Sequence, residues 1–159
     1  MISARVGQIR KAEAESHTEA YTTHSLFSPG SWLAKPVKTV MELLPLFEGY
    51  TQFAALDLGS GVGRNCIPVA QHFCGIPCRV DCVDILELAV AKLNDNAQQY
   101  GVADHIRGIV SAIDDYEITA DSYDLIMQFL RWNTSPHSLL LRRSWLKSGM
   151  VCDPVVLPV

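Results

Sequence analysis

The sequence predicts an α/β fold in which a mostly parallel sheet is flanked by helices. Short apolar runs alternate with amphipathic helical patterns from about residue 36 to residue 128. Parallel strands require such helical crossovers between them. The chain has 159 residues, of which 48% are hydrophobic and 19% charged, which suits one domain with a real core.

Three ranges have the spacing of amphipathic helices. In residues 36–48, apolar side chains recur at helical spacing, Pro36 suits the first turn, and Gly49 follows as a stop signal. Residues 64–73 form the second predicted helix, and residues 87–100 form the third, which Gly101 ends. The predicted buried stripe of this third helix consists of Leu88, Val90, Ala91, Leu93 and Ala97.

Four apolar runs predict strands at residues 53–58, 79–85, 106–110 and 123–130. Their alternation with helices indicates parallel pairing through right-handed crossovers. Residues 1–25 are polar and mixed in charge, with a thin apolar face. We therefore expect one core domain over residues 1–130, with an N-terminal arm over residues 1–30 and an atypical tail over residues 131–159.

A glycine-rich turn follows the first predicted strand. Residues 56–64 have the sequence LDLGSGVGR, which contains Asp57 and, at alternate positions, Gly59, Gly61 and Gly63. Glycines between a strand and a helix allow bare backbone N–H groups to approach a ligand. The spacing is not the G-x-G-x-x-G of the dinucleotide fingerprint, and Asp57 would repel a pyrophosphate but suit a cationic amine. A purely structural turn is the alternative.

A second acid, Asp84, ends the next predicted strand. A carboxylate at this position can accept hydrogen bonds from both hydroxyls of a ribose. The alternative is that Asp84 caps the helix that starts at Glu87.

Taken in order, these pieces resemble the class I S-adenosylmethionine-dependent methyltransferases over about residues 35–127. The resemblance implies a Rossmann-like methyltransferase core, strand order 3-2-1-4 and S-adenosylmethionine as the cofactor. It places Ile85 against the adenine. The acid that often binds the adenine amine would fall on Ala112, so backbone at Ala112 and Ile113, or Asp114 after a loop shift, is expected there. The cofactor residues implied are Asp57, Gly59, Ser60, Gly61, Gly63, Asp84, Ile85, Ala112 and Ile113.

After Met127 the family pattern is not found, and the core is expected to be truncated after the fourth strand. One permitted set of codons for residues 128–135, read after insertion of one base, encodes Ala-Val-Ser-Ala-Leu-Glu-His-Val, a string similar to what this family carries there. The hypothesis is a frameshifted tail, and the alternative is genuine divergence. Either would leave the fourth strand as an apolar edge prone to self-association.

Composition excludes several classes of partner. A net charge of −4 and a pI near 5.7 give no signal for nucleic acid, and no apolar run is long enough for a membrane span. The N-terminus lacks a secretory apolar segment, so a cytoplasmic location is expected. Five cysteines suggest reduced thiols. Cys74, Cys78 and Cys82 lack the paired spacing of zinc sites, so no metal is expected.

The function implied by the resemblance is methyl transfer to an unidentified acceptor, impaired in this chain by its tail. The resemblance assigns no catalytic residue. Two alternatives remain: a non-catalytic cofactor-binding remnant, and a nucleotide- or NAD-binding Rossmann domain, which the glycine spacing disfavours.

Overall fold

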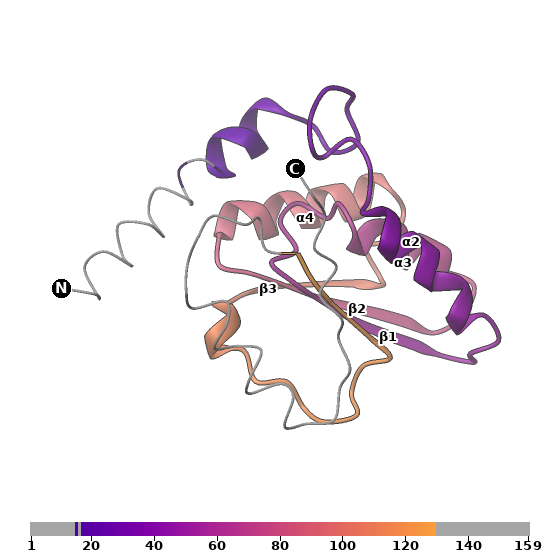
Figure 1. Cartoon of the computed structure of the whole chain (residues 1–159). Helices are drawn as coiled ribbons and strands as arrows, with labels where there is room; N and C mark the ends of the chain where they lie inside the picture. The colour runs from indigo at the N-terminus through magenta and orange to yellow at the C-terminus, as the bar shows by residue number, and fades with distance from the viewer. Residues whose placement is uncertain (1–14, 16, 130–159) are drawn as a thin grey trace.

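The computed structural model describes residue 15 and residues 17–129, and these residues are built around a four-stranded sheet (Figure 1). The strands are β1 (Phe53–Leu58), β2 (Cys78–Asp84), β3 (Ile106–Val110) and β4 (Leu125–Gln128). Their order is β3-β2-β1-β4, and all three pairings are parallel. The predicted fold class and strand order are therefore confirmed.

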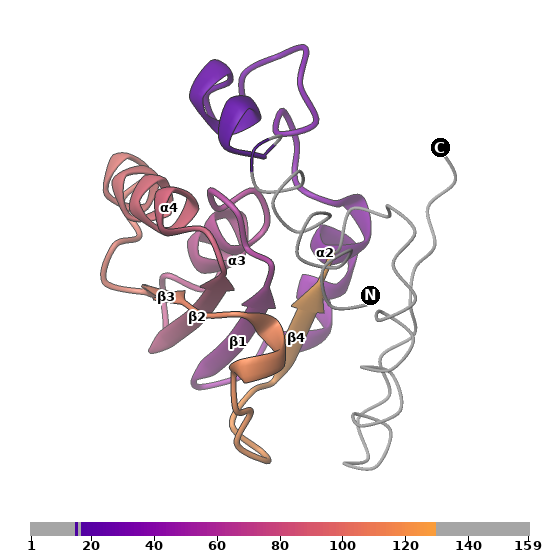
Figure 2. The same cartoon turned by 90° about the vertical axis from the view of Figure 1, so that its left-hand side faces the viewer.

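Helices α2 (Lys38–Leu43), α3 (Cys66–His72) and α4 (Glu87–Gln99) cover one face of the sheet (Figure 2). Two short 3-10 turns complete the described elements: η1 (Leu44–Phe47) continues α2, and η2 (Ile113–Asp115) follows β3. The orange segment between β3 and β4 lies on the opposite face of the sheet from these helices (Figure 2). No helix among residue 15 and residues 17–129 is long and apolar enough to cross a membrane.

The predicted helix over residues 36–48 is shorter than expected. It begins at Lys38 after the N-cap Val37, so Pro36 precedes the helix instead of opening it. It changes to a 3-10 turn at Leu44, where Pro45 lacks the N–H that an α-helix would need. In α4 the predicted stripe is correct at Val90, Leu93 and Ala97, but Ala89 is buried in place of Ala91, which is exposed.

The main core fills the space between the sheet and the three helices. Its strand residues include Ala55, Val80 and Cys82, all fully buried. The segment before α2 contributes to the same core through Tyr21 and Leu26. The apolar face of this N-terminal segment is thus small but packed.

The second face of the sheet combines an apolar cluster with a polar network. Leu56, Leu58 and Val83 form the cluster. Beside it, the Tyr123 hydroxyl donates to Asp81 Oδ2 over 2.6 Å, and the Tyr116 and Tyr123 hydroxyls lie 2.9 Å apart. This network ties the chain between β3 and β4 to the middle of β2.

The N-terminal segment is docked on α4 and on the start of α3. Residues 17–23 are helical. The Phe27 ring meets Tyr100 edge-on at 5.3 Å, and the Tyr100 hydroxyl donates to the Leu26 carbonyl over 3.4 Å. At the entry to α2, Val37 N–H donates to Asn65 Oδ1 over 3.0 Å. The segment is thereby placed next to the turn that leads into α3.

Candidate functional site

The glycine turn leaves the carboxyl end of β1 and crosses the end of β2. Gly59, Gly61 and Gly63 have φ angles of 76°, 55° and 103°, the left-handed region that glycine tolerates best. The N–H groups of Gly59 and Ser60 donate to the Val83 carbonyl over 2.8 and 3.1 Å. The predicted cofactor loop therefore lies at the edge of a parallel sheet where ligands of α/β proteins bind.

Asp84 organises this loop through both of its carboxylate oxygens. Oδ2 accepts from Gly61 N–H over 2.9 Å, and Oδ1 accepts from Leu86 N–H over 2.9 Å. The N-cap of α4 is Leu86, without a side-chain cap, so Asp84 binds the backbone just before the helix and does not itself cap it. Each oxygen of a carboxylate has a second lone pair, so these bonds leave acceptor capacity for a ligand.

Asp57 is buried under the same loop with an unsatisfied oxygen. Its side chain is 1% exposed, and Asp57 Oδ2 and Ser60 Oγ have no hydrogen-bond partner among the described residues. Burial, and secondly the nearby Asp84 carboxylate, raise the pKa of Asp57 to about 7. A buried, unpaired acceptor is costly and favours a cationic donor at this point.

Gly63 has a different reason to be glycine. A Cβ built there would lie 2.6 Å from Ile67 Cδ1 and 2.8 Å from Leu93 Cδ1. These contacts are with the side chains of α3 and α4, so Gly63 permits close packing of the two helices. Its predicted part in the cofactor loop stays a prediction.

Sequence analysis missed Tyr21, which lies against Gly61. A Cβ built on Gly61 would lie 2.6 Å from the Tyr21 hydroxyl oxygen and 3.3 Å from Cζ. Tyr21 is 5% exposed. Its pKa is raised by burial first and then by Asp84 and Asp57. No local pattern could have indicated this contact, because it joins residues forty positions apart.

The predicted adenine wall lies at the ends of β2 and β3. Ile85 is 54% exposed, unusual for a large apolar side chain. Ser111 N–H donates to the Asp84 carbonyl over 3.0 Å, which places the chain at Ala112 and Ile113 beside the end of β2. The Ala112 carbonyl already accepts from Ser111 Oγ and from Asp115 N–H. The predicted site residues thus meet at the carboxyl ends of β1, β2 and β3.

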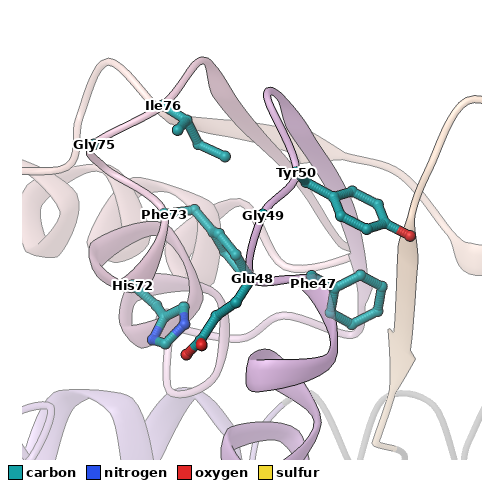
Figure 3. A pocket seen from close by; sticks show the side chains of 8 residues that line it. All are labelled: Phe47, Glu48, Gly49, Tyr50, His72, Phe73, Gly75 and Ile76. Atoms are coloured by element: carbon teal, nitrogen blue, oxygen red, sulfur yellow. The ribbon is translucent and has the colours of Figure 1, made fainter.

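Two hollows lie on the described part of the chain, and Tyr21 and Val62, which flank the Gly61 turn, line the second one. One, of about 170 Å³, lies at the amino ends of β1 and β2, where Figure 3 shows Glu48 and His72 among aromatic side chains. Another, of about 250 Å³, separates Tyr21 and Leu26 from α4. Within the described part of the chain, four cysteines are free and no group of three or more metal-binding side chains is found.

Comparison with known proteins identifies the family of the chain. Residues 55–145, more than half of the chain, match the family described as "Methyltransferase domain". The match continues beyond Met127. Among curated proteins, no sequence matches the chain.

Two solved structures with TM-scores above 0.5 show the same fold. An RNA methyltransferase from Salinibacter ruber, in complex with S-adenosyl-L-homocysteine, has a TM-score of 0.56 and 24% identity over 72% of this chain and 69% of its own. A candidate S-adenosyl-L-methionine-dependent methyltransferase from Methanococcus maripaludis has a TM-score of 0.53 and 18% identity over 67% of this chain and 48% of its own. YcgJ from Bacillus subtilis has a TM-score of 0.46 and 22% identity, over 57% of this chain and 36% of its own.

The parallel sheet and its glycine loop define a Rossmann-like α/β protein. The chain belongs to the methyltransferase domain family. The predicted class and fold are confirmed, and family membership supports S-adenosylmethionine as the cofactor. The chain spans between 36% and 69% of the lengths of the three structures compared.

Proposed function

We propose that this chain binds S-adenosylmethionine at the glycine loop and takes part in methyl transfer to an acceptor. The observation that supports this most is the pair of unsatisfied buried acceptors, Asp57 Oδ2 and Ser60 Oγ, beside a second acid, Asp84. Two carboxylates at a glycine loop suit a ligand with cationic and hydroxyl groups. They do not suit the pyrophosphate of a dinucleotide, whose negative charge they would repel.

The residues present fit the parts of this cofactor. In this proposal Asp57 and Ser60 receive its ammonium group, Asp84 receives the ribose hydroxyls, and Ile85 lies against the adenine. Backbone at Ala112 and Ile113 completes the adenine wall. The bound cofactor supplies a methyl group activated on a sulfonium. The chain then contributes mainly by binding and orientation, because alignment of two reactants removes much of the entropic barrier.

Calorimetry with three ligands tests the proposal. We expect S-adenosylmethionine and S-adenosylhomocysteine to bind at one site per chain and NADH not to bind. The Asp57→Asn variant, which removes the negative charge but keeps the shape, should bind both sulfur ligands more weakly. Binding of NADH in preference to either of them would overturn the proposal and support the dinucleotide alternative.

Whether this chain catalyses methyl transfer is a separate proposal. We infer that methyl transfer is impaired, because the substrate side of the site would be built from residues that follow Met127, and of these the family match includes only residues 128–145. A methyltransferase assay beside calorimetry distinguishes the cases: binding without turnover is the result expected of a non-catalytic cofactor-binding remnant. Turnover by the 159-residue chain would contradict the impairment.

The origin of the tail stays a prediction as well. The predicted change of reading frame after Met127 concerns residues that lie almost wholly outside the described part of the chain. The family match, which continues to residue 145, favours genuine divergence. Sequencing the coding DNA around codon 128 decides between them. If no longer open frame follows the insertion of one base, the frameshift hypothesis is wrong.

A further inference from the structure

Tyr21 fills the space over the backbone of Gly61. The three heavy atoms nearest to a Cβ built on Gly61 all belong to the Tyr21 side chain, and the hydroxyl oxygen is closest at 2.6 Å. Ser60, Gly61 and Val62 are all buried. The Tyr21 side chain therefore occupies the space that a ligand would need in order to contact the backbone at Gly61.

The Tyr21 hydroxyl also lies in the electric field of the two site acids. Asp84 and Asp57 both act on it strongly enough to raise its pKa, after the larger effect of burial. The tyrosine therefore stays protonated and presents a neutral hydroxyl to an acidic site. A cationic ligand gains more from the same two carboxylates than a neutral hydroxyl does, because charge-assisted bonds are the stronger ones.

Tyr21 contacts two aromatic rings in the N-terminal segment. The Tyr21 ring lies 5.6 Å from the His17 ring and 6.0 Å from the Trp32 ring. The remaining side chains of the helix over residues 17–23 include four exposed ones, namely Thr18, Glu19, Thr22 and Thr23. Within residues 17–23 Tyr21 is the one fully buried side chain, so this part of the helix has few buried contacts to lose when it moves.

The chain that follows this helix is anchored more firmly. Leu33 is 1% exposed, and the Leu26 carbonyl accepts from the Tyr100 hydroxyl. Arg64 Nε donates to the Lys35 carbonyl over 2.6 Å, and the Arg64 guanidinium lies 5.7 Å from the centre of the Trp32 ring. Residues 26–37 therefore form a fixed base from which the helix over residues 17–23 can swing.

We propose that Tyr21 is a gate of the cofactor site: its side chain occupies the place over Gly61 in the closed form and must withdraw before the cofactor can reach the loop. The inference rests on the proposed function, since the ligand that displaces Tyr21 is a nucleoside carrying a cationic amino-acid group. Binding then exchanges a neutral hydroxyl for a cation beside Asp57 and Asp84. The helix over residues 17–23 moves with the tyrosine, so cofactor binding repositions the N-terminal segment.

Stopped-flow binding of S-adenosylhomocysteine tests the gate. The full chain has three tryptophans, so substitution of Trp132 and Trp145 by Phe leaves Trp32, which contacts the gate, as the single reporter. In this background we expect ligand binding to change Trp32 emission. We expect Tyr21→Ala to raise the association rate constant about tenfold, the factor for a parent whose open form is about a tenth of the population. Calorimetry should show tighter binding by a similar factor.

Two further variants serve as controls. Tyr21→Phe keeps the ring over Gly61, so its association rate should stay near that of the parent. Tyr50→Ala removes a tyrosine that is 46% exposed at the other end of the sheet, and it should leave both the rate and the affinity unchanged. If circular dichroism shows that Tyr21→Ala does not fold, Tyr21→Leu replaces it, with the same expectation of faster binding.

The outcomes separate the gate from the proposed function. If the parent and Tyr21→Ala bind S-adenosylhomocysteine with the same rate, the gate is wrong and the proposed function stands. If Tyr21→Ala binds more weakly, Tyr21 is a wall of the site and not a gate. If no variant binds the cofactor or its product, the proposed function fails and the gate fails with it. Binding by Tyr21→Ala alone supports both.

Discussion

The two ends of the sheet are built on opposite principles. At the carboxyl end, glycines with positive φ, two buried acids and an unpaired oxygen lie together. At the amino end, aromatic rings pack on one another: Phe53 and Phe73 are stacked at 3.9 Å, and Phe47 meets Phe53 at 5.3 Å. The carboxyl end leaves polar groups available to a ligand, whereas the amino end is stabilised by the packing of its own side chains.

This difference indicates that ligand binding is concentrated at the carboxyl end of the sheet and stability at the amino end. Unpaired buried polar groups destabilise a fold unless a ligand completes them, so they indicate a site. Stacked rings contribute stability and offer little for recognition. The hollow lined by Phe47, His72 and Phe73 is therefore a weaker site candidate than the glycine loop (Figure 3). Substitutions at the two ends should have opposite consequences.

The largest expected effect on binding is that of Gly61→Val. The new side chain would meet the Tyr21 hydroxyl and would require φ of 55°, which a β-branched residue adopts only with strain. We expect S-adenosylhomocysteine binding to be lost in calorimetry while circular dichroism still shows a folded chain. The matched control is Gly75→Ala at the amino end, where a Cβ meets nothing within 4 Å. Unchanged affinity in Gly61→Val would contradict the assignment of the loop.

At the amino end, Phe73→Ala should lower the stability of the fold and leave ligand affinity unchanged. Removal of a buried ring that stacks on Phe53 should lower the free energy of unfolding by about 3–5 kcal/mol. The dissociation constant of S-adenosylhomocysteine, measured on the folded fraction at low temperature, should stay that of the parent. A large loss of affinity with little loss of stability would refute the division between the two ends.

An intermediate effect is expected of Asp84→Ala. Loss of a charge-assisted hydrogen bond should weaken binding by about 1.5–3 kcal/mol. Because Asp84 also holds the N–H groups of Gly61 and Leu86, some stability should be lost as well. A 2′-deoxy ligand should lose affinity on the parent but far less on the variant. Equal losses of affinity on the parent and on the variant would mean that Asp84 only organises the loop. The control is Asp104→Ala, which removes an exposed acid before β3.

Asp57 should make stability depend on pH. Its pKa is raised from 3.8 to about 7 in the folded chain, so between these values the native state binds more protons than the unfolded state. Stability contributed by this group should therefore fall as pH rises through that window, by at most about 1.4 kcal/mol per pH unit. Denaturant unfolding at several pH values should show that the free energy of unfolding of the parent falls with pH, and that it falls less steeply in Asp57→Asn.

The affinity for the cofactor should depend on pH in the opposite direction from the stability of the fold. A cation beside Asp57 favours its ionised form, so binding near pH 6 should release protons and tighten as pH rises. Calorimetry in two buffers of different ionisation enthalpy measures the protons released. Uptake of protons on binding would contradict the placement of the ammonium group at Asp57.

The smallest expected effect concerns the sheet edge. Among the described residues β4 pairs only with β1, and we propose that its outer edge allows self-association. Sedimentation should show a concentration-dependent increase in mass, and Gln128→Lys, which adds a charge to the edge, should reduce it. A monomer at all concentrations would show that the edge is not used.

Patterns local in sequence predicted the fold well. β1 and β3 have the predicted bounds, and the strand order follows from the alternation of strands and helices. The errors are local too: Pro45 turns the end of α2 into a 3-10 turn, and in the stripe of α4 Ala89 is buried in place of Ala91. Such errors concern side-chain spacing and leave the topology unchanged.

The site was predictable in part only. Strand ends and glycines place Asp57 and Asp84 at one edge of the sheet, since carboxyl ends of parallel strands meet there. The contact of Tyr21 with Gly61, and the packing role of Gly63, depend on tertiary distances that no spacing in the sequence encodes. The ligand roles of the individual residues stay predictions until binding is measured.

The crowding around Gly63 has a consequence for redesign of the loop. Since a Cβ at Gly63 would press on the side-chain ends of Ile67 and Leu93 at a φ of 103°, a library that randomises residues 59–63 together would place a strained side chain at this position in most of its members. A library that varies Ser60 and Tyr21 and keeps Gly63 constant would sample ligand preference on an intact scaffold. Within five residues, then, the loop holds one position, Ser60, that faces the ligand in this proposal and one, Gly63, that serves the packing of α3 and α4.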